Sequence, residues 1–463
     1  MPSSSKARQS SPCSDFPPPA TFRHRLATLL ASQMSGTFAD RSELLEQQCL
    51  GDEGRSITLP QPEHRIDLLL GGSDDSDESH AATELSDDEL LVLLNRGAVK
   101  HRELEAKLRN NTRAVALRRH HILPELQDDS LPYRHYDYTP VTGACCENVV
   151  GYVPVPAGIA GPLLVDGEMF RVPMATTEGA LIASTNRGCA VIREAGGSGV
   201  QTRITDDGMT RAPVLRFDRA AGAVDAAKWI NDPLNRPAIQ AAFQKDSRGA
   251  NEAIKYIVSQ RPGARVISLS GNMCSDKKAA HINWLFGRGK SVVADVVIPA
   301  AIVERLLHTT VDDLVEMCSA KMGRGSSNAG TVGGSNAHAA NIVAAIFIAT
   351  GQDVAQVVSS SMCSTIMEKT NGGALQMSCT MRCLEVVEAK PALLRIKRFA
   401  TCAHACQLAR IIAATVLAGE LSLSAALCND ELVKSHMKLN RSQVVLHDGA
   451  AQRPESGKVV GFL

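Results

Sequence analysis

The chain of 463 residues is long enough to fold into about two to four domains with a large buried core. Its 49 basic and 49 acidic residues balance, which argues against a nucleic-acid-binding protein whose affinity rests on a broad basic surface. Its 13 cysteines are scattered without an early signal peptide, and the adjacent Cys145 and Cys146 suit no disulfide framework, which indicates reduced thiols in a cytosolic setting. No CxxC pair is followed by spaced histidines, so we expect no structural zinc or other metal site.

The N-terminal part divides into a linker and a helical domain. Residues 1–82 are rich in Pro, Ser and acidic side chains, and we expect them to be disordered. A helical domain is predicted over residues 83–140. Its first helix follows Ser86, an N-cap residue, and begins with an acidic turn. A second helix is predicted over residues 104–120, where the basic cluster that ends it favours a helix C-terminus.

The next segments combine an extended stretch with a carboxylate at a helix start. Residues 147–163 contain three Gly and three Pro, a pattern typical of an irregular extended segment packed against something else, such as a partner subunit. Glu178 then stands where a strand gives way to a helix predicted over residues 180–190. A glutamate at this position ordinarily complements the helix dipole, so its pattern alone does not demand catalysis.

A polar segment over residues 270–290 follows a strand predicted over residues 264–269. Here Asp276 directly precedes Lys277 and Lys278. One ammonium beside a carboxylate can stabilise an oxyanion, and a second can bind a substrate carboxylate. The alternative is a solvated turn, which is the usual meaning of a short charge run.

The C-terminal half is more apolar. Residues 330–338 are glycine-rich and open a buried helix over residues 339–350, which suits either a phosphate loop or close helix packing. A long apolar helix is predicted over residues 404–428. Its segment 411–427 carries Glu420 and is too short for a membrane span, so we expect a buried helix. A late histidine, His436, is either structural or a proton donor.

Six motifs occur in one order along the chain. They are ACCENVVGYVPVPAGIAGPL, MATTEG with STNRG, DGMTR, SGN followed by DKKAAHINW and GRGKSVV, GGSNAHAANIV with GQD, and LAGELSL with SHM. Together they closely resemble the catalytic domain of the 3-hydroxy-3-methylglutaryl-coenzyme A (HMG-CoA) reductase family, class I, eukaryotic type. The resemblance runs from about residue 86 to residue 442.

The resemblance implies an α+β fold. A large helical and mixed domain that binds HMG-CoA would comprise residues 141–210 and 265–442. A small α/β, ferredoxin-like domain for the cofactor would be inserted at residues 211–264 and is truncated here. Residues 443–463 would form a disordered tail.

The resemblance also implies roles for individual residues. Glu178 would donate a proton, Lys277 would stabilise the oxyanion, Asp353 would tune their protonation, and His436 would protonate the coenzyme A thiolate. The substrate would be bound by Arg211, Ser270, Asp276, Lys278, Lys321 and Asn341, with Ser184, Asn186 and Arg187 along coenzyme A. The cofactor NADPH would contact Ser247, Arg248, Asn440 and Arg441, and phosphorylation of Ser442 would lower activity by repelling the cofactor phosphate.

Partners and location follow from the same resemblance. Family members share active sites between subunits of a dimer-based oligomer, here expected to be a tetramer, with the DKK segment reaching in from the neighbour. They bind no nucleic acid. Eukaryotic members are tethered to the endoplasmic reticulum by a membrane region, whereas this sequence shows no membrane span and is expected to be cytoplasmic.

Two cofactor motifs of the family are missing. No DAMGMN-type dinucleotide motif occurs between Arg211 and Ser270, where about 30 residues, roughly one βαβ unit, are absent. No TVGGGT-like loop follows Met381. Two functions therefore stay open: an NADPH-dependent reductase that makes mevalonate, and a non-redox acyl-CoA-binding or regulatory variant. A thiol enzyme is a third, weaker alternative, because no ordered base accompanies a cysteine in the sequence.

Overall fold

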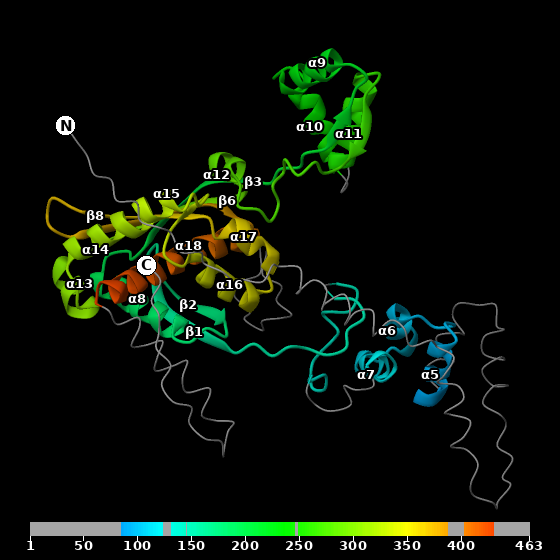
Figure 1. Cartoon of the computed structure of the whole chain (residues 1–463), viewed down its shortest axis with the longest axis horizontal. Helices are drawn as coiled ribbons and strands as arrows, with labels where there is room; N and C mark the ends of the chain where they lie inside the picture. Colours follow the sequence, from blue (N-terminus) through cyan, green and yellow to red (C-terminus); the bar gives the residue numbers. More distant parts are fainter. Residues whose placement is uncertain (1–84, 124–130, 145, 246–248, 388–401, 430–463) are drawn as a thin grey trace, which may run out of the picture. The chain divides into compact units, whose positions relative to one another are not determined.

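The computed structural model describes residues 85–123, 131–144, 146–245, 249–387 and 402–429 (Figure 1). The chain divides into two compact units, Met1–Val99 and Lys100–Leu463. The expectations for residues 1–82 and for the C-terminal tail lie outside the described residues.

Helix α5, Asp87–Asn95, lies in the first unit. It begins after Ser86, as the sequence predicted. The Ser86 hydroxyl accepts from the backbone N–H of Glu89, and the Glu89 carboxylate accepts from the backbone N–H of Ser86 at 2.8 Å. This reciprocal capping box satisfies two N–H groups that a helix start otherwise leaves without partners.

The prediction of a single helix over residues 104–120 was wrong. The chain instead forms a 3-10 turn η1, His101–Glu103, then α6, Leu104–Leu108, and α7, Asn111–Ile122. Arg109 is left-handed with a φ of 50°, and the Asn110 side chain accepts from the backbone N–H of Arg113, so Asn110 caps a new helix.

The basic cluster lies at the C-terminus of α7, as predicted, with Arg119, His120 and His121 in the last turn. The buried guanidinium of Arg118 donates to the Val149 carbonyl at 2.7 Å, and that of Arg119 donates to the Val150 carbonyl at 2.8 Å. Arg118 and Arg119 thus also bind the start of the extended segment, a contact that the sequence did not predict.

That extended segment is irregular only at its beginning. From Ala157 it becomes β1, Ala157–Val165, paired antiparallel with β2, Glu168–Ala175, so the prediction of irregular structure up to residue 163 was wrong. The register shifts between Ala160 and Leu163, around Pro162, because proline has no N–H for the ladder.

A mixed five-stranded sheet forms the centre of the second unit. Its order is β3-β6-β9-β8-β7, and its neighbours are antiparallel except for the parallel pair β7 and β8. The strands are β3, Gln201–Gly208; β6, Gly289–Ile298; β7, Gly334–Ser335; β8, Cys363–Lys369; and β9, Leu375–Leu384. Alternate residues of β6 are buried, which is the pattern of a strand with one face in the core. The mixed α/β character expected from the sequence is confirmed at this coarse level.

Helix α18, Cys402–Cys428, is the main core helix and confirms the long helix predicted here. It contacts β3, β6 and β9, together with α8, Leu181–Ala195, and α16, Ala339–Thr350 (Figure 1). The backbones of α8 and α18 cross closely, because a Cβ added at Gly188 would lie 1.9 Å from the Ala418 carbonyl oxygen. Both α8 and α16 also match helices predicted from the sequence.

One described helix satisfies the length and apolarity of a membrane span, Ala405–Cys428 within α18. The expectation that this segment is too short was therefore wrong. The expectation that it is a buried helix is confirmed, because 83% of its most apolar window is buried inside the protein.

Shorter helical segments complete the second unit. They are α12, His281–Phe286; α13, Ala300–Leu307; α14, Val311–Cys318; the π-helix η3, Ser319–Gly325; α15, Ser326–Asn328; the 3-10 turn η4, Val354–Gln356; and α17, Val357–Ser360.

Residues between β3 and β6 contain a small two-stranded sheet of their own. Strand β4, Val214–Arg216, pairs antiparallel with β5, Arg265–Ser268. The connecting helices are α9, Ala220–Asn231; α10, Arg236–Gln244; and α11, Gly249–Gln260 (Figure 1). Strand β5 confirms the strand predicted over residues 264–269. A ferredoxin-like βαββαβ unit has four strands, and the described residues of this region form two.

Candidate active site

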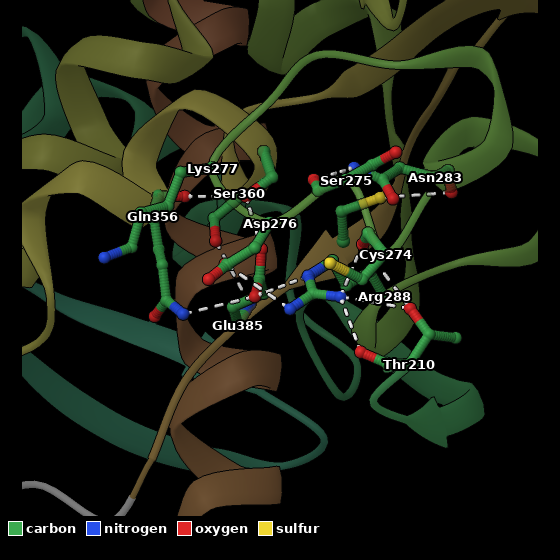
Figure 2. A network of polar contacts seen from close by, with 12 residues as sticks. Thr210, Cys274, Ser275, Asp276, Lys277, Asn283, Arg288, Gln356, Ser360 and Glu385 are labelled. Atoms are coloured by element: carbon green, nitrogen blue, oxygen red, sulfur yellow. Dashed lines mark hydrogen bonds and ion pairs between the residues drawn. The ribbon is translucent and has the colours of Figure 1, made fainter. Parts of the chain in front are cut away.

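The loop between β5 and α12 presents Lys277 in a constrained conformation. Asn272, Ser275 and Lys277 have left-handed φ values of 60°, 49° and 58°. For residues other than glycine this conformation costs about 1–2 kcal/mol each, so the surroundings must hold it. The buried Asn283 amide of α12 does part of this, donating to the carbonyls of Ser275 and Lys278 at 2.9 Å each (Figure 2).

Lys277 forms an ion pair with Asp353, another residue that the sequence singled out. The distance from Nζ to Oδ2 is 2.8 Å, and the side chains are 43% and 45% exposed. Asp353 also caps η4, accepting from the backbone N–H of Ala355 at 3.0 Å. This cap fixes one carboxylate oxygen, and the exposure leaves the pair accessible to a substrate.

Each member of this pair stabilises the charged form of the other. The hydrogen bond to Asp353 raises the pKa of Lys277 above its usual 10.5. The hydrogen bond from Lys277 lowers the pKa of Asp353 below its usual 3.8, against the opposing effect of burial. An ammonium is therefore present at neutral pH where an oxyanion could be stabilised.

A buried arginine that the sequence reasoning did not single out holds the same loop. Arg288 is 2% exposed, and its Nη1 donates to the Cys274 carbonyl at 2.7 Å (Figure 2). Its Nη2 lies 3.4 Å from Oδ1 of Asp276, and its Nε donates to Oε2 of Glu385 at 2.8 Å. The only signal in the sequence was an arginine between two glycines in the GRGK motif.

Glu385 completes this buried pair at the end of β9. It accepts from the Gln356 side chain at 3.2 Å and from the Ser359 hydroxyl, and its backbone N–H donates to the Ser360 hydroxyl at 3.0 Å (Figure 2). Burial raises the pKa of Glu385 above its usual 4.5, although Ser359 and Arg288 act in the opposite direction.

Glu178 lies between β2 and α8, as the sequence predicted. Its Oε2 accepts from the Asn341 side chain of α16 at 2.7 Å, and its backbone N–H donates to the Thr176 hydroxyl at 3.0 Å. Among the described residues, no hydrogen bond or ion pair joins Glu178 and Asn341 to Lys277 and Asp353. The structure therefore brings the four residues together as two separate pairs.

The residues expected along coenzyme A make contacts inside the protein. The hydroxyl groups of Ser184 and Ser422 lie 3.0 Å apart, and Arg187 donates to the Ser422 hydroxyl at 3.0 Å and to its carbonyl at 2.7 Å. Asn186 accepts from the backbone N–H of Gly161 at 2.7 Å. All three side chains thus tie α8 to its neighbours.

The expected substrate residues are spread over the loop and nearby elements. The Ser270 hydroxyl lies 3.4 Å from the Cys274 thiol and lowers its pKa. Lys278 donates to the Asp276 carbonyl at 3.3 Å. Arg211 is exposed between β3 and β4, and Lys321 is exposed on η3. The remaining predicted residues, His436, Ser247, Arg248, Asn440, Arg441 and Ser442, lie outside the described residues.

The start of α16 is already occupied by a side chain. The Glu420 carboxylate, fully buried on α18, accepts from the backbone N–H groups of Ala337 and His338 at 2.7 Å each. A carboxylate in this place leaves no room for a phosphate at the helix N-terminus. A Cβ at Gly333 would also lie 2.8 Å from the Met362 side chain, so the close-packing interpretation of the glycine-rich segment holds and the phosphate-loop alternative is wrong.

Within the described part of the chain, no group of three His, Cys, Asp or Glu residues could hold a metal ion. Burial raises the pKa of the Cys189 thiol to about 12 and that of Cys383 to about 11. These thiols are therefore protonated at neutral pH and make poor nucleophiles.

Comparison with known proteins shows the family of this chain. The model of the family described as hydroxymethylglutaryl-coenzyme A reductase matches residues 111–252 and 247–441. The chain belongs to this family. The two matched stretches meet at residues 247–252, within the region that lacks the dinucleotide motif.

Curated relatives carry the same description. The 3-hydroxy-3-methylglutaryl-coenzyme A reductase of Strongylocentrotus purpuratus is 43% identical over 417 residues, covering 77% of this chain and 44% of the relative. That of Drosophila melanogaster is 42% identical over 451 residues, covering 84% and 48%. The chain thus spans about half the length of these reductases. A solved reductase from Streptococcus pneumoniae aligns with a TM-score of 0.48 at 17% identity, covering 80% of this chain and 92% of that one.

Proposed function

We propose that this chain carries out the two-step reduction of HMG-CoA to mevalonate and coenzyme A, with NADPH as the hydride donor. The observation that carries the proposal is the exposed ion pair between Lys277 and Asp353 at 2.8 Å, in a chain of the reductase family. Family membership favours this function over the non-redox acyl-CoA-binding or regulatory alternative.

The pairs suit the chemistry of thioester reduction. Each hydride addition builds negative charge on an oxygen, and the Lys277 ammonium can stabilise it. Asp353 keeps that ammonium protonated and oriented. Glu178, oriented by Asn341, would carry the proton that the new hydroxyl group needs. His436 would protonate the departing thiolate.

Substrate binding would use the surface around the same loop. The HMG carboxylate would contact Ser270, Lys278 and Arg211, of which the two cationic side chains are exposed. Asp276, Lys321 and Asn341 would complete the pocket. Along coenzyme A, Ser184 and Arg187 would exchange their contacts with Ser422 for contacts with the ligand, and Asn186 would contribute beside them.

A second subunit would complete the site. The proposal is supported by the two separate pairs, since no hydrogen bond or ion pair joins Glu178 to Lys277 among the described residues of one chain. In a dimer-based oligomer, Glu178 of one protomer would meet the Lys277–Asp353 pair of its partner. A tetramer and a cytoplasmic location stay predictions.

The described residues include more of the contacts expected for HMG-CoA than of those expected for NADPH. The turn from β4 to α9, Phe217 to Arg219, contains no glycine that would let a pyrophosphate approach the helix start. The two-stranded sheet supports a truncated ferredoxin-like domain. Ser247, Arg248, Asn440 and Arg441 would contact NADPH, whose nicotinamide supplies the hydride when bound.

Equilibrium binding and turnover test this function together. Purified chain is titrated with HMG-CoA and with NADPH, and NADPH consumption is followed by absorbance with both present. The expected result is HMG-CoA-dependent consumption that falls by about 100-fold or more in K277A, because an oxyanion-stabilising group is lost. Binding of HMG-CoA without any consumption of NADPH would instead support the non-redox alternative.

A further inference from the structure

We propose that the buried Arg288–Glu385 ion pair is a positioning device that presents Lys277 to Asp353. The proposal rests on the proposed function, because Lys277 is the group that the pair would position. Neither side chain is accessible enough to touch a substrate, since both are at most 4% exposed.

Arg288 holds the loop in place through contacts with residues that come just before Lys277. Its guanidinium donates to the Cys274 carbonyl at 2.7 Å and faces the Asp276 carboxylate at 3.4 Å. It also donates to the hydroxyl and carbonyl of Thr210, at 3.1 and 3.3 Å, in the segment that follows β3. Its guanidinium thus fixes the path of the loop from two sides (Figure 2).

Glu385 fastens the segment that carries Asp353. Its carboxylate accepts from Gln356, the last residue of η4, at 3.2 Å and from Ser359 of α17. Asp353 caps the same η4 turn. The buried pair therefore connects the two segments whose exposed side chains form the Lys277–Asp353 pair.

The exposed pair needs such support. An ion pair whose members are 43% and 45% exposed contributes little to stability, so it cannot hold a loop with three left-handed residues by itself. A buried pair behaves differently, because removing one partner leaves an uncompensated charge in the interior. The buried pair therefore sets the geometry, and the exposed pair meets the substrate.

The test separates positioning from general stability. The double variant R288M/E385L removes both charges, so it leaves no unpaired charge between them and is expected to fold. The matched control is R118M, which removes another buried arginine that pairs with Glu105 at 2.8 Å and lies far along the chain from Lys277. Both variants are measured as the full chain, after thermal unfolding shows that they are folded.

The first readout is independent of activity. Amide hydrogen exchange of residues 272–278 is expected to become about 10-fold faster in R288M/E385L and to stay unchanged in R118M, because only the first variant releases the loop. Unchanged exchange in the double variant would overturn the proposal, whatever the chain catalyses.

The second readout is kinetic. In R288M/E385L we expect kcat for HMG-CoA reduction to fall about 100-fold, as a misplaced catalytic ammonium would cause, with KM for NADPH unchanged. A kcat within about 2-fold of the wild-type value, or an equal loss in R118M, would contradict positioning. If the wild-type chain and K277A have the same activity, the proposed function fails, and the exchange measurement still decides the positioning.

Discussion

At the scale of single residues, the Lys277–Asp353 pair keeps both of its charges across the neutral pH range. The pKa of Asp353 lies below 3.8 and that of Lys277 above 10.5. The charge of Asp353 therefore contributes fully to the stability of the fold above the pKa that this carboxyl has in the unfolded chain. The contribution is lost as pH falls through the lower pKa of the folded chain. The charge of Lys277 contributes fully to the stability of the fold below the pKa that this amine has in the unfolded chain. The contribution is lost as pH rises through the higher pKa of the folded chain. Both charges persist across the neutral range, so any activity change there comes from another group.

The variant D353N is expected to lower the pKa of Lys277, because its hydrogen bond to Asp353 is the largest cause of the upward shift. The measurement is the pH dependence of Lys277 modification by an amine-reactive reagent, followed by mass spectrometry. The control D312N removes the carboxylate from another exposed pair, with Lys369 at 2.8 Å, and should leave Lys277 unaffected. Identical modification curves for D353N and wild type would show that the pair does not form.

Asn341 is expected to orient Glu178 through its 2.7 Å hydrogen bond. N341A should therefore lower kcat about 10- to 100-fold with little change in the unfolding midpoint, because a catalytic carboxyl group loses its orientation. Steady-state kinetics with HMG-CoA checks this, with Q201A on the exposed strand β3 as the control. Full activity in N341A would mean that Glu178 is oriented by other groups or has no role.

At this scale the sequence was informative about side chains with chemical motifs. It predicted Glu178 at a helix start and selected Lys277 and Asp353, which the fold joins. It missed Arg288 and Glu385, because they are 97 residues apart and only the pairing of the sheet brings them together. A buried ion pair has no local sequence signature, whereas a DKK triplet does.

At the scale of elements, the crossing of α8 and α18 depends on a missing side chain. A Cβ at Gly188 would lie 1.9 Å from a carbonyl oxygen of α18, and a rigid helix backbone cannot move aside at little cost. G188A is expected to lower the free energy of unfolding by about 3 kcal/mol. Denaturant unfolding checks this, with G208A as the control, since a Cβ there meets nothing within 4 Å. Equal stabilities of the two variants would mean that the helices separate easily.

Helices were predicted correctly where a long apolar run marked them. The prediction failed where a single capping residue determined where one helix ends and the next begins. The apolar runs that became α16 and α18 were strong signals, because each is buried over most of its surface. The break between α6 and α7 went unnoticed because Asn110 competes with a continuous amphipathic pattern by capping a new helix. The extended segment was placed correctly, but its pairing as β1 depended on β2, its partner strand.

At the scale of the whole molecule, the second unit combines one large core with a small region between β3 and β6 that has a sheet of its own. The five-stranded sheet, α8, α16 and α18 form one continuous core, and α16 carries Asn341, the partner of Glu178. The small region has two described strands, and the two stretches matched by the family model overlap within it, at residues 247–252. From its missing motifs the sequence predicts a truncated cofactor domain here, and this stays a prediction. The resemblance implied that the DKK segment reaches in from a neighbouring subunit. The separate pairs of Glu178 and Lys277 in one chain are compatible with that arrangement, which stays a prediction.

We propose above all that this chain reduces HMG-CoA through Lys277. The most direct measurement is NADPH consumption by the purified chain with and without HMG-CoA, alongside mevalonate formation and the K277A variant. The account predicts two hydrides transferred per mevalonate in the wild type and an activity lower by about 100-fold or more in K277A. HMG-CoA binding with no NADPH consumption, or equal turnover by K277A, would contradict it.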